Sequence, residues 1–129
     1  MNMTRIESRH NPLLLHLKKL LTSRAYREKC GQFAAEGTKL LEEAAKSYPA
    51  LDTVVVQEGV QLCPLPAHVR VAEVPQALMQ SVSQMDAPQG AAFICNMPQE
   101  RAARVQAGCV LLDGIQDPGN LGTILRTAD

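Results

Sequence analysis

Three residues near the C-terminal end have the types and spacing of a site for an anion or an oxygen atom. Asn120 follows an Asp-Pro-Gly turn, and residues 121–128 have the apolar spacing of a helix, so we expect Asn120 at the helix N-cap. Gly122 and Arg126 are one helical turn apart. Because helical side chains lean toward the N-terminus, Arg126 is predicted to lie over Gly122, near free N–H groups that attract anions.

A strand has to position this helix. Residues 109–112 form an apolar run that predicts a strand, and residues 113–119 form the loop that follows it. The site would then lie after the carboxyl end of a strand, where α/β proteins bind polar ligands. An ordinary turn followed by a solvated arginine fits the same spacing, so both interpretations stay open at this point.

A strand and one helix are half of a βαβ unit, which needs a returning strand to cover the helix. We therefore expect this chain to be a fragment, with the apolar stripe of its last helix lacking its normal cover. The composition turns polar after residue 96. The expected division is a first domain over residues 1–96, a linker over residues 97–107 and the start of a second domain over residues 108–129.

The first domain alternates segments of helical and strand periodicity. A stripe of leucines follows Asn11 and Pro12, which suit the N-cap and the first helical position. Leu40 and Ala77 are expected to face inward from two later helices. Helices are predicted after the caps Asn11, Ser23 and Thr38 and from Pro75 onward, and strands over residues 32–35, 52–57, 69–72 and 91–95. This alternation predicts a layered α/β domain with a mostly parallel or mixed sheet.

Composition excludes several classes of protein. With 129 residues, 46% of them hydrophobic and 20% charged, the chain is globular rather than disordered. Its longest apolar run, residues 91–95, is far shorter than the roughly 20 residues of a membrane helix, and no signal peptide is recognisable. The four cysteines lack C-x-x-C spacing. We therefore expect no metal site, no disulfide framework, no membrane partner and a cytoplasmic location.

Charge is balanced overall but not along the chain. Basic and acidic residues number 13 each. Residues 1–46 contain nine basic and five acidic residues, whereas residues 47–129 contain four and eight. A basic N-terminal third indicates a polyanion partner on one face, with a solvated basic helix as the alternative.

The sequence D-G-I-Q-D-P-G-N-L-G-T-I-L-R-T-A-D at 113–129 resembles the first motif of the SpoU (TrmH-type) RNA ribose methyltransferases of the SPOUT superfamily. That motif has approximately the form D-x-x-x-D-P-x-N-x-G-x-I-x-R-T-A, and every specified position is matched. Three further segments are similar to the N-terminal substrate-binding domain of that family: I-E-S-R-H-N-P at 6–12, R-E-K-C-G-Q-F-A-A-E-G at 27–37 and S-Q-M-D-A-P-Q-G-A at 83–91. The resemblance covers nearly the whole chain.

The resemblance implies a fold and a reaction. Residues 1–96 would form a three-layer α/β/α sandwich like that of kink-turn-binding ribosomal proteins, and residues 108–129 would form the first strand and helix of a truncated trefoil-knot domain. The family transfers a methyl group from S-adenosylmethionine to a ribose 2′-hydroxyl of ribosomal or transfer RNA. Two later motifs, absent from this sequence, bind that cofactor and form the homodimer interface, so we expect the chain to be inactive alone.

By the same resemblance, Arg126 acts on the ribose hydroxyl and Asn120 helps to hold the site. A hydroxyl is a weak nucleophile that needs a base or stabilisation of its developing charge. Neutralising a guanidinium at pH 7 costs about 9 kcal/mol, which disfavours a literal arginine base. A charged Arg126 that orients phosphate and stabilises the oxyanion avoids that cost, and a ligand phosphate is the alternative proton acceptor.

RNA binding is assigned to basic residues of the first domain. The sequence has four aromatic residues, too few for a base-stacking platform, so recognition of RNA shape and phosphate is expected. His10, His16 and His68 have no ligand-like spacing and are interpreted as surface residues, and Glu36 is expected to face the start of the next helix. The candidate RNA-binding residues are Arg9, His10, Lys18, Lys19, Arg24, Arg27 and Lys29.

Two other functions stay open. A non-catalytic RNA-binding module of the ribosomal-protein type would explain the basic third, but it would have no need of residues 113–129. A small phosphate- or nucleotide-binding α/β enzyme is a weaker candidate, because the sequence has neither a G-x-G-x-x-G nor a Walker loop.

Overall fold

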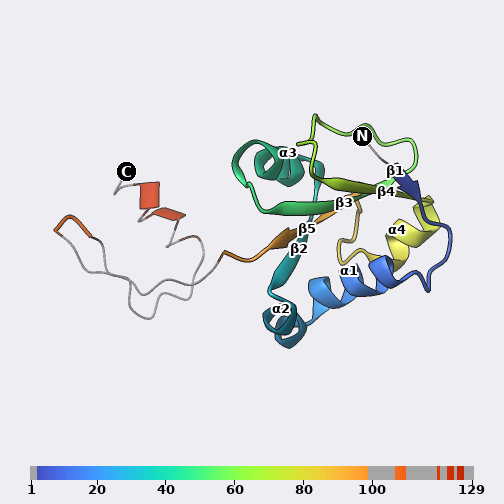
Figure 1. Cartoon of the computed structure of the whole chain (residues 1–129), viewed down its shortest axis with the longest axis horizontal. Helices are drawn as coiled ribbons and strands as arrows, with labels where there is room; N and C mark the ends of the chain where they lie inside the picture. The colour runs from blue at the N-terminus through green and yellow to red at the C-terminus, as the bar shows by residue number, and fades with distance from the viewer. Residues whose placement is uncertain (1–2, 99–106, 110–118, 120–121, 124, 127–129) are drawn as a thin grey trace. The chain divides into compact units, whose positions relative to one another are not determined.

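The computed structural model describes residues 3–98, 107–109, 119, 122–123 and 125–126. The chain divides into two compact units, Met1–Pro98 and Gln99–Asp129. In the described part, the first unit is a mixed α/β fold with one five-stranded sheet and four helices (Figure 1). None of the described helices is both long and apolar enough to cross a membrane.

The sheet is mixed, as the sequence predicted. Its strands are β1 (Met3–Arg5), β2 (Gln32–Glu36), β3 (Leu51–Gln57), β4 (Arg70–Val74) and β5 (Ala91–Asn96). Their order is β1-β4-β3-β5-β2, with parallel pairing from β1 to β3 and antiparallel pairing from β3 to β2. In the central strand β3, Val55 packs on one face and Val54 and Val56 on the other. The expected burial of this strand on both faces is confirmed.

Local signals set the first two helices. The helices are α1 (Pro12–Thr22), α2 (Arg24–Cys30), α3 (Thr38–Ser47) and α4 (Gln76–Val82). The Asn11 side chain accepts a hydrogen bond from the Leu13 amide at 2.9 Å and caps α1. Ser23 caps α2 in the same way through the Tyr26 amide, and Gly31, at φ 66°, ends it in the left-handed conformation.

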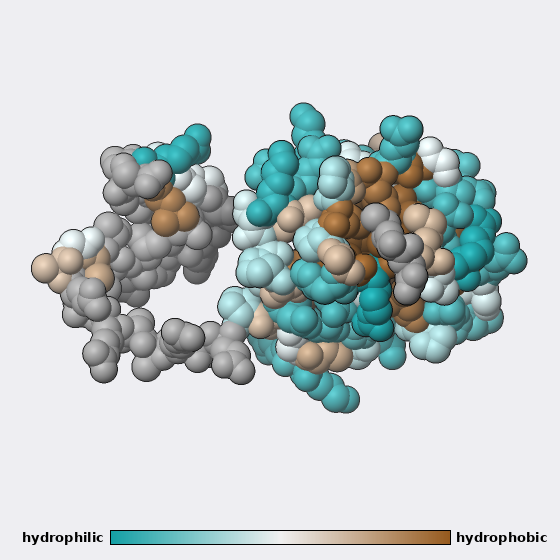
Figure 2. Space-filling model, turned by 45° about the horizontal axis from the view of Figure 1, so that its top comes forward, coloured by the Kyte–Doolittle hydropathy of each residue, from teal (hydrophilic) through white to brown (hydrophobic). Residues whose placement is uncertain are grey.

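Helices lie on both faces of the sheet (Figure 1). The α1 and α4 side chains pack on one face with Val55 and Ile94. The other face is covered by α3, through Leu41, and by the segment that joins β3 to β4. Figure 2 shows apolar side chains gathered near the segment that joins β3 to β4, beside α3, within a mostly hydrophilic surface.

Several local expectations are wrong. Leu40 is 51% exposed, and Ala77 is exposed while Met79 is buried in its place. Gly37, not Thr38, is the N-cap of α3. Thr38 is the first residue of the helix, and its amide donates a hydrogen bond to Gln89 Oε1 at 2.8 Å. Strand β4 continues to Val74, and β1 was not predicted at all, since it has only three residues and all are exposed.

Glu36 also differs from expectation. Its carboxylate accepts hydrogen bonds from the Ser83 hydroxyl and, at 2.8 Å, from the Gln84 amide. It therefore fixes the end of α4 against β2 and does not face the start of α3.

In the second unit, the described residues 119, 122–123 and 125–126 are helical. Gly119 was expected in the preceding turn, but helix ends commonly differ by one or two residues from sequence estimates. Leu125 is 58% exposed.

Candidate nucleic-acid interface

Positive charge is concentrated on one pair of helices. The third helix carries two lysines and two glutamates, and α4 carries no charged residue. By contrast, α1 and α2 together have one carboxylate, Glu28, and five cationic side chains: Lys18, Lys19, Arg24, Arg27 and Lys29. This imbalance gives the surface formed by α1 and α2, the α1–α2 surface, the local charge that attracts a polyanion.

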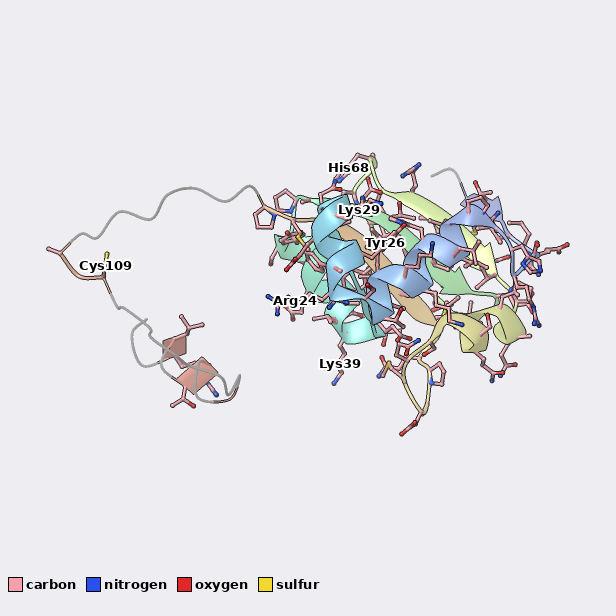
Figure 3. All side chains as sticks on the ribbon, turned by 90° about the horizontal axis from the view of Figure 1, so that it is seen from below. Arg24, Tyr26, Lys29, Lys39, His68 and Cys109 are labelled. Carbon is pink, nitrogen blue, oxygen red and sulfur yellow. The ribbon has the colours of Figure 1, made fainter. Side chains whose placement is uncertain are left out.

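The helix α2 has no buried residue and is held by a few specific contacts. The Tyr26 ring meets His16 edge-on, with 5.5 Å between centroids, and Lys19 Nζ lies 5.4 Å from the same ring. The Arg27 guanidinium donates to the Leu20 carbonyl at 2.8 Å. Figure 3 shows Arg24, Tyr26 and Lys29 on α2. The cations of α2 are therefore positioned through Tyr26 and Arg27.

His16 is not an isolated surface residue, contrary to expectation. Its Nδ1 lies 2.7 Å from the Tyr26 hydroxyl and its Nε2 lies 2.7 Å from Gln32 Oε1. The Gln32 amide donates in turn to Asn96 Oδ1 at 2.9 Å. Burial, followed by the neighbouring Cys30 side chain, raises the pKa of Tyr26. A line of hydrogen bonds thus joins α2 to the ends of β2 and β5.

His68 also has a partner, since its Nε2 lies 3.0 Å from the Leu51 carbonyl oxygen. This bond connects the segment before β4 to the start of β3. His68 is exposed, so its interpretation as a surface residue is confirmed.

The cations differ in how firmly they are engaged. Arg24 pairs with Glu28 at 3.1 Å, but both side chains are exposed. Such i,i+4 pairs contribute only about 0.3–0.5 kcal/mol, so a phosphate can displace the carboxylate. Among the described residues, the side chains of Arg9, His10, Lys18 and Lys29 have no hydrogen-bond or ion-pair partner.

The opposite edge of the sheet is neutralised. Arg5 on β1 binds Glu58 at 2.7 Å and Glu73 at 2.8 Å, and Glu7 lies 3.4 Å away. The hydrogen bond to Glu58, followed by that to Glu73, raises the pKa of Arg5. With three carboxylates around one guanidinium, this edge does not attract RNA.

The second unit contains the other predicted site. Arg126 Nε lies 3.4 Å from the Gly122 carbonyl, and a Cβ placed at Gly122 would meet nothing within 4 Å. The Arg126 side chain therefore reaches back one helical turn to the Gly122 carbonyl. Asn120 lies outside the described residues.

Comparison with known proteins identifies the family. The model of the MRM3-like substrate binding domain matches residues 11–92, which is well over half of the chain. The chain belongs to this family. The matched region contains α1, α2 and most of the sheet, so the α1–α2 surface is part of the MRM3-like domain.

Relatives of the MRM3-like chain are named as RNA methyltransferases. The 23S rRNA (guanosine(2553)-2′-O)-methyltransferase RlmP of Bacillus subtilis is 35% identical over 98% of this chain and 51% of its own length. A solved TrmH-family RNA methyltransferase structure from Porphyromonas gingivalis is 34% identical, with a TM-score of 0.70 over 90% of this chain and 46% of its own. The AdoMet-bound rRNA methyltransferase of Sinorhizobium meliloti is 25% identical, with a TM-score of 0.64 over 98% and 50%. The chain thus spans about half the length of these relatives.

Several small cavities open on the described part of the MRM3-like chain. Four of its surface cavities have volumes of about 210 to 290 Å³. These volumes fall below the roughly 300 Å³ at which pockets begin to bury drug-sized ligands. No group of three or more potential metal ligands occurs among the described residues.

Sequence reasoning missed two residues of this domain. His16 was missed because its partners Tyr26 and Gln32 lie 10 and 16 residues along the chain and reach it only when α1, α2 and β2 pack together. Lys39 is exposed in the first turn of α3 and was not included among the RNA-binding candidates, although its type alone could have indicated it. Figure 3 shows Lys39 on the edge of the domain.

Proposed function

We propose that this chain is the RNA-binding half of an rRNA 2′-O-ribose methyltransferase that uses S-adenosylmethionine. The observation that carries the proposal is the five-to-one excess of cationic over acidic side chains on the α1–α2 surface. It occurs in an MRM3-like domain whose relatives are named as enzymes that act on ribosomal RNA. RNA is the polyanion that fits both findings.

The proposal gives each part of the chain a role. Residues 1–96 bind substrate and have a three-layer arrangement like that of kink-turn-binding ribosomal proteins. Residues 97–107 are the linker between this domain and the next. Residues 108–129 open a trefoil-knot methyltransferase domain that continues beyond this sequence. That domain holds the cofactor and forms a homodimer, and the enzyme acts in the cytoplasm. The coverage of relatives by about half their length supports this division.

Recognition of RNA would depend on phosphates and shape. Tyr26 is the aromatic residue of α1 and α2, and its ring is contacted by His16 and by the Lys19 ammonium. The described aromatic rings on this side therefore do not offer a series of open stacking faces. Lysine and arginine contacts to the backbone carry the affinity instead.

The catalytic role falls to Arg126. As a cation it orients an RNA phosphate, which takes the proton of the 2′-hydroxyl, and it stabilises negative charge on the 2′-oxygen as the methyl group is transferred. The open position at Gly122 leaves space for the sugar beside the guanidinium. Asn120 helps to hold that site. S-adenosylmethionine supplies the methyl group and is bound by residues outside this chain.

RNA binding by the 129-residue chain tests the proposal. We expect binding to a transcript of large-subunit ribosomal RNA with a slope of log affinity against log salt near −3, for about four phosphate contacts. Arg24→Glu combined with Lys29→Glu should weaken binding at least tenfold. Lys46→Glu on α3 is the matched control and should leave it nearly unchanged. Affinity that does not depend on salt, or equal losses in both variants, would refute the assignment of this surface.

Methyl transfer is the second test. The 129-residue chain should transfer no methyl group from labelled S-adenosylmethionine to ribosomal RNA. In the whole enzyme, Arg126→Ala should abolish transfer while RNA affinity, set by the α1–α2 surface, is retained. Near-normal transfer by a correctly folded Arg126→Ala enzyme would exclude this catalytic role.

A further inference from the structure

A small cationic pocket lies between the turn that precedes α1, the helix α1 itself and the last turn of α4. Its volume is about 210 Å³. Arg9, His10 and Lys18 line it, together with the buried Leu14 and Val82 and with Leu15, which is 46% exposed. Three of the seven candidate RNA-binding residues therefore meet at one hollow, which is separate from the cluster on α2.

The turn that carries Arg9 and His10 is held in place before any ligand binds. The Ser8 hydroxyl accepts from the His10 amide at 3.2 Å, and the Ser8 carbonyl accepts from the Asn11 amide at 3.1 Å. Asn11 continues into α1 through its cap on Leu13. Because the backbone is fixed on the helix, little conformational entropy is lost when the pocket is filled.

The electrostatic surroundings favour an anion. No carboxylate lines the pocket, and the nearest acidic residue in sequence, Glu7, lies beside Arg5 at 3.4 Å. Three carbonyls near the end of α4, those of Leu78, Met79 and Val82, already accept hydrogen bonds, which weakens their repulsion of an anion. Ser81 Oγ donates to the Leu78 carbonyl at 2.7 Å, and the Ser83 amide donates to that of Met79 at 3.0 Å.

We propose that this pocket holds one phosphate of the RNA backbone, bound between Arg9 and Lys18, with the attached sugar against Leu15. The inference rests on the proposed RNA-binding function and specifies one contact within it. A volume of about 210 Å³ suits a sugar-phosphate unit and is too small to enclose a drug-sized ligand. An apolar floor below a cationic rim matches the carbon face of a ribose joined to a charged phosphodiester.

The salt dependence of RNA binding tests this contact on the 129-residue chain. The variants are Arg9→Gln, Lys18→Gln and the double variant, with Lys46→Gln on α3 as the matched control. If both residues bind the same phosphate, the double variant should lower the steepness of log affinity against log salt by about 0.7–0.9, the value for one phosphate. The loss should be the same for RNAs of different sequence. Lys46→Gln should keep the wild-type slope.

Three outcomes would overturn the proposal. An unchanged slope in the double variant would show that the pocket does not contact RNA. A decrease of about twice the expected size would place Arg9 and Lys18 on two different phosphates. Saturable binding of inorganic phosphate at constant ionic strength, together with an unchanged RNA slope, would make a free anion the ligand. In each case RNA binding by the wild-type chain, and its loss in the α2 variants, would still report separately on the proposed function.

Discussion

Replacing Gly90 by alanine should destabilise the first unit far more than the same change at Gly31. Both glycines have positive φ, 83° and 66°, where an added Cβ costs about 1–2 kcal/mol. At Gly31 that Cβ meets nothing within 4 Å. At Gly90 it would lie 2.8 Å from Val60 Cγ2 and 3.2 Å from Gln57 Cβ.

The contact with Gln57 Cβ decides how much stability Gly90→Ala loses. Val60 can change its rotamer, but Gln57 Cβ moves only with the backbone of β3. Moving Gly90 instead would break the hydrogen bond from the Gln57 amide to the Gly90 carbonyl, which is 2.8 Å long. Overpacking of this kind adds about 1–3 kcal/mol, so we expect losses of about 1–2 kcal/mol for Gly31→Ala and about 2–5 kcal/mol for Gly90→Ala.

Urea denaturation followed by circular dichroism measures both free energies of unfolding. In thermal unfolding, Gly90→Ala should melt at least about 4 °C below Gly31→Ala, since 1 kcal/mol shifts the melting temperature of a domain of 60–100 residues by about 4–8 °C. Equal stability of the two variants would show that the steric argument at Gly90 is wrong.

Three further predictions concern other elements. Tyr26→Ala should speed amide hydrogen exchange in α2 and weaken RNA binding several-fold, because α2 has no buried residue of its own. Exchange in β3 should stay unchanged. Faster exchange throughout the sheet would contradict this prediction. Leu41→Ala should lower the free energy of unfolding, measured in urea, by about 2–5 kcal/mol, and Leu40→Ala should lower it by less than about 1 kcal/mol. The reason is that Leu41 is 2% exposed and Leu40 is 51% exposed. Similar losses in the two variants would contradict this difference in burial. Burial, and then the charge of Asp52, raises the pKa of Cys95 to about 11 from an ordinary 9.0. The thiol of the unfolded chain therefore ionises at lower pH than that of the folded chain, and the free energy of unfolding should decrease between about pH 9 and 11. Cys95→Ala should reduce this decrease. The same pH profile of stability in both proteins would contradict the argument.

The sequence predicted those parts of the fold that are specified by neighbouring residues. Asn11 and Pro12 set the start of α1, and Gly31 sets the end of α2, through hydrogen bonds and dihedral angles within a few residues. The sequence therefore predicted α1 and the end of α2. Leu40 was misplaced because the stripe of α3 shows which residues share a face but not how far the sheet extends beneath them. It borders an apolar cavity with Phe33 of β2, the last strand of the sheet.

The candidate surface was foreseen in its residue types but not in its grouping. Lys18 and Lys19 are adjacent in sequence, yet the rotation of about 100° between them on a helix separates their roles. Lys18 lines the pocket with Arg9, whereas Lys19 lies over Tyr26 of α2. The bonds of His16 to Tyr26 and Gln32 depend on how α1, α2 and β2 pack against one another, which no local signal encodes.

A chain with no net charge can bind RNA because salt limits the range of each charge. Glu28 belongs to α2, whereas Glu58 binds Arg5 on β1. Four strand spacings, roughly 19 Å, separate β1 from β2, the strand that directly follows α2, and the Debye length at 0.1 M salt is about 10 Å. Over that distance a unit charge contributes less than about 0.1 kcal/mol, but at 4 Å it contributes about 1 kcal/mol in water. Glu28→Gln should therefore raise RNA affinity up to about fivefold, whereas Glu58→Gln should leave it within error. Equal gains from the two variants would mean that the total charge of the chain, and not the α1–α2 surface, governs binding.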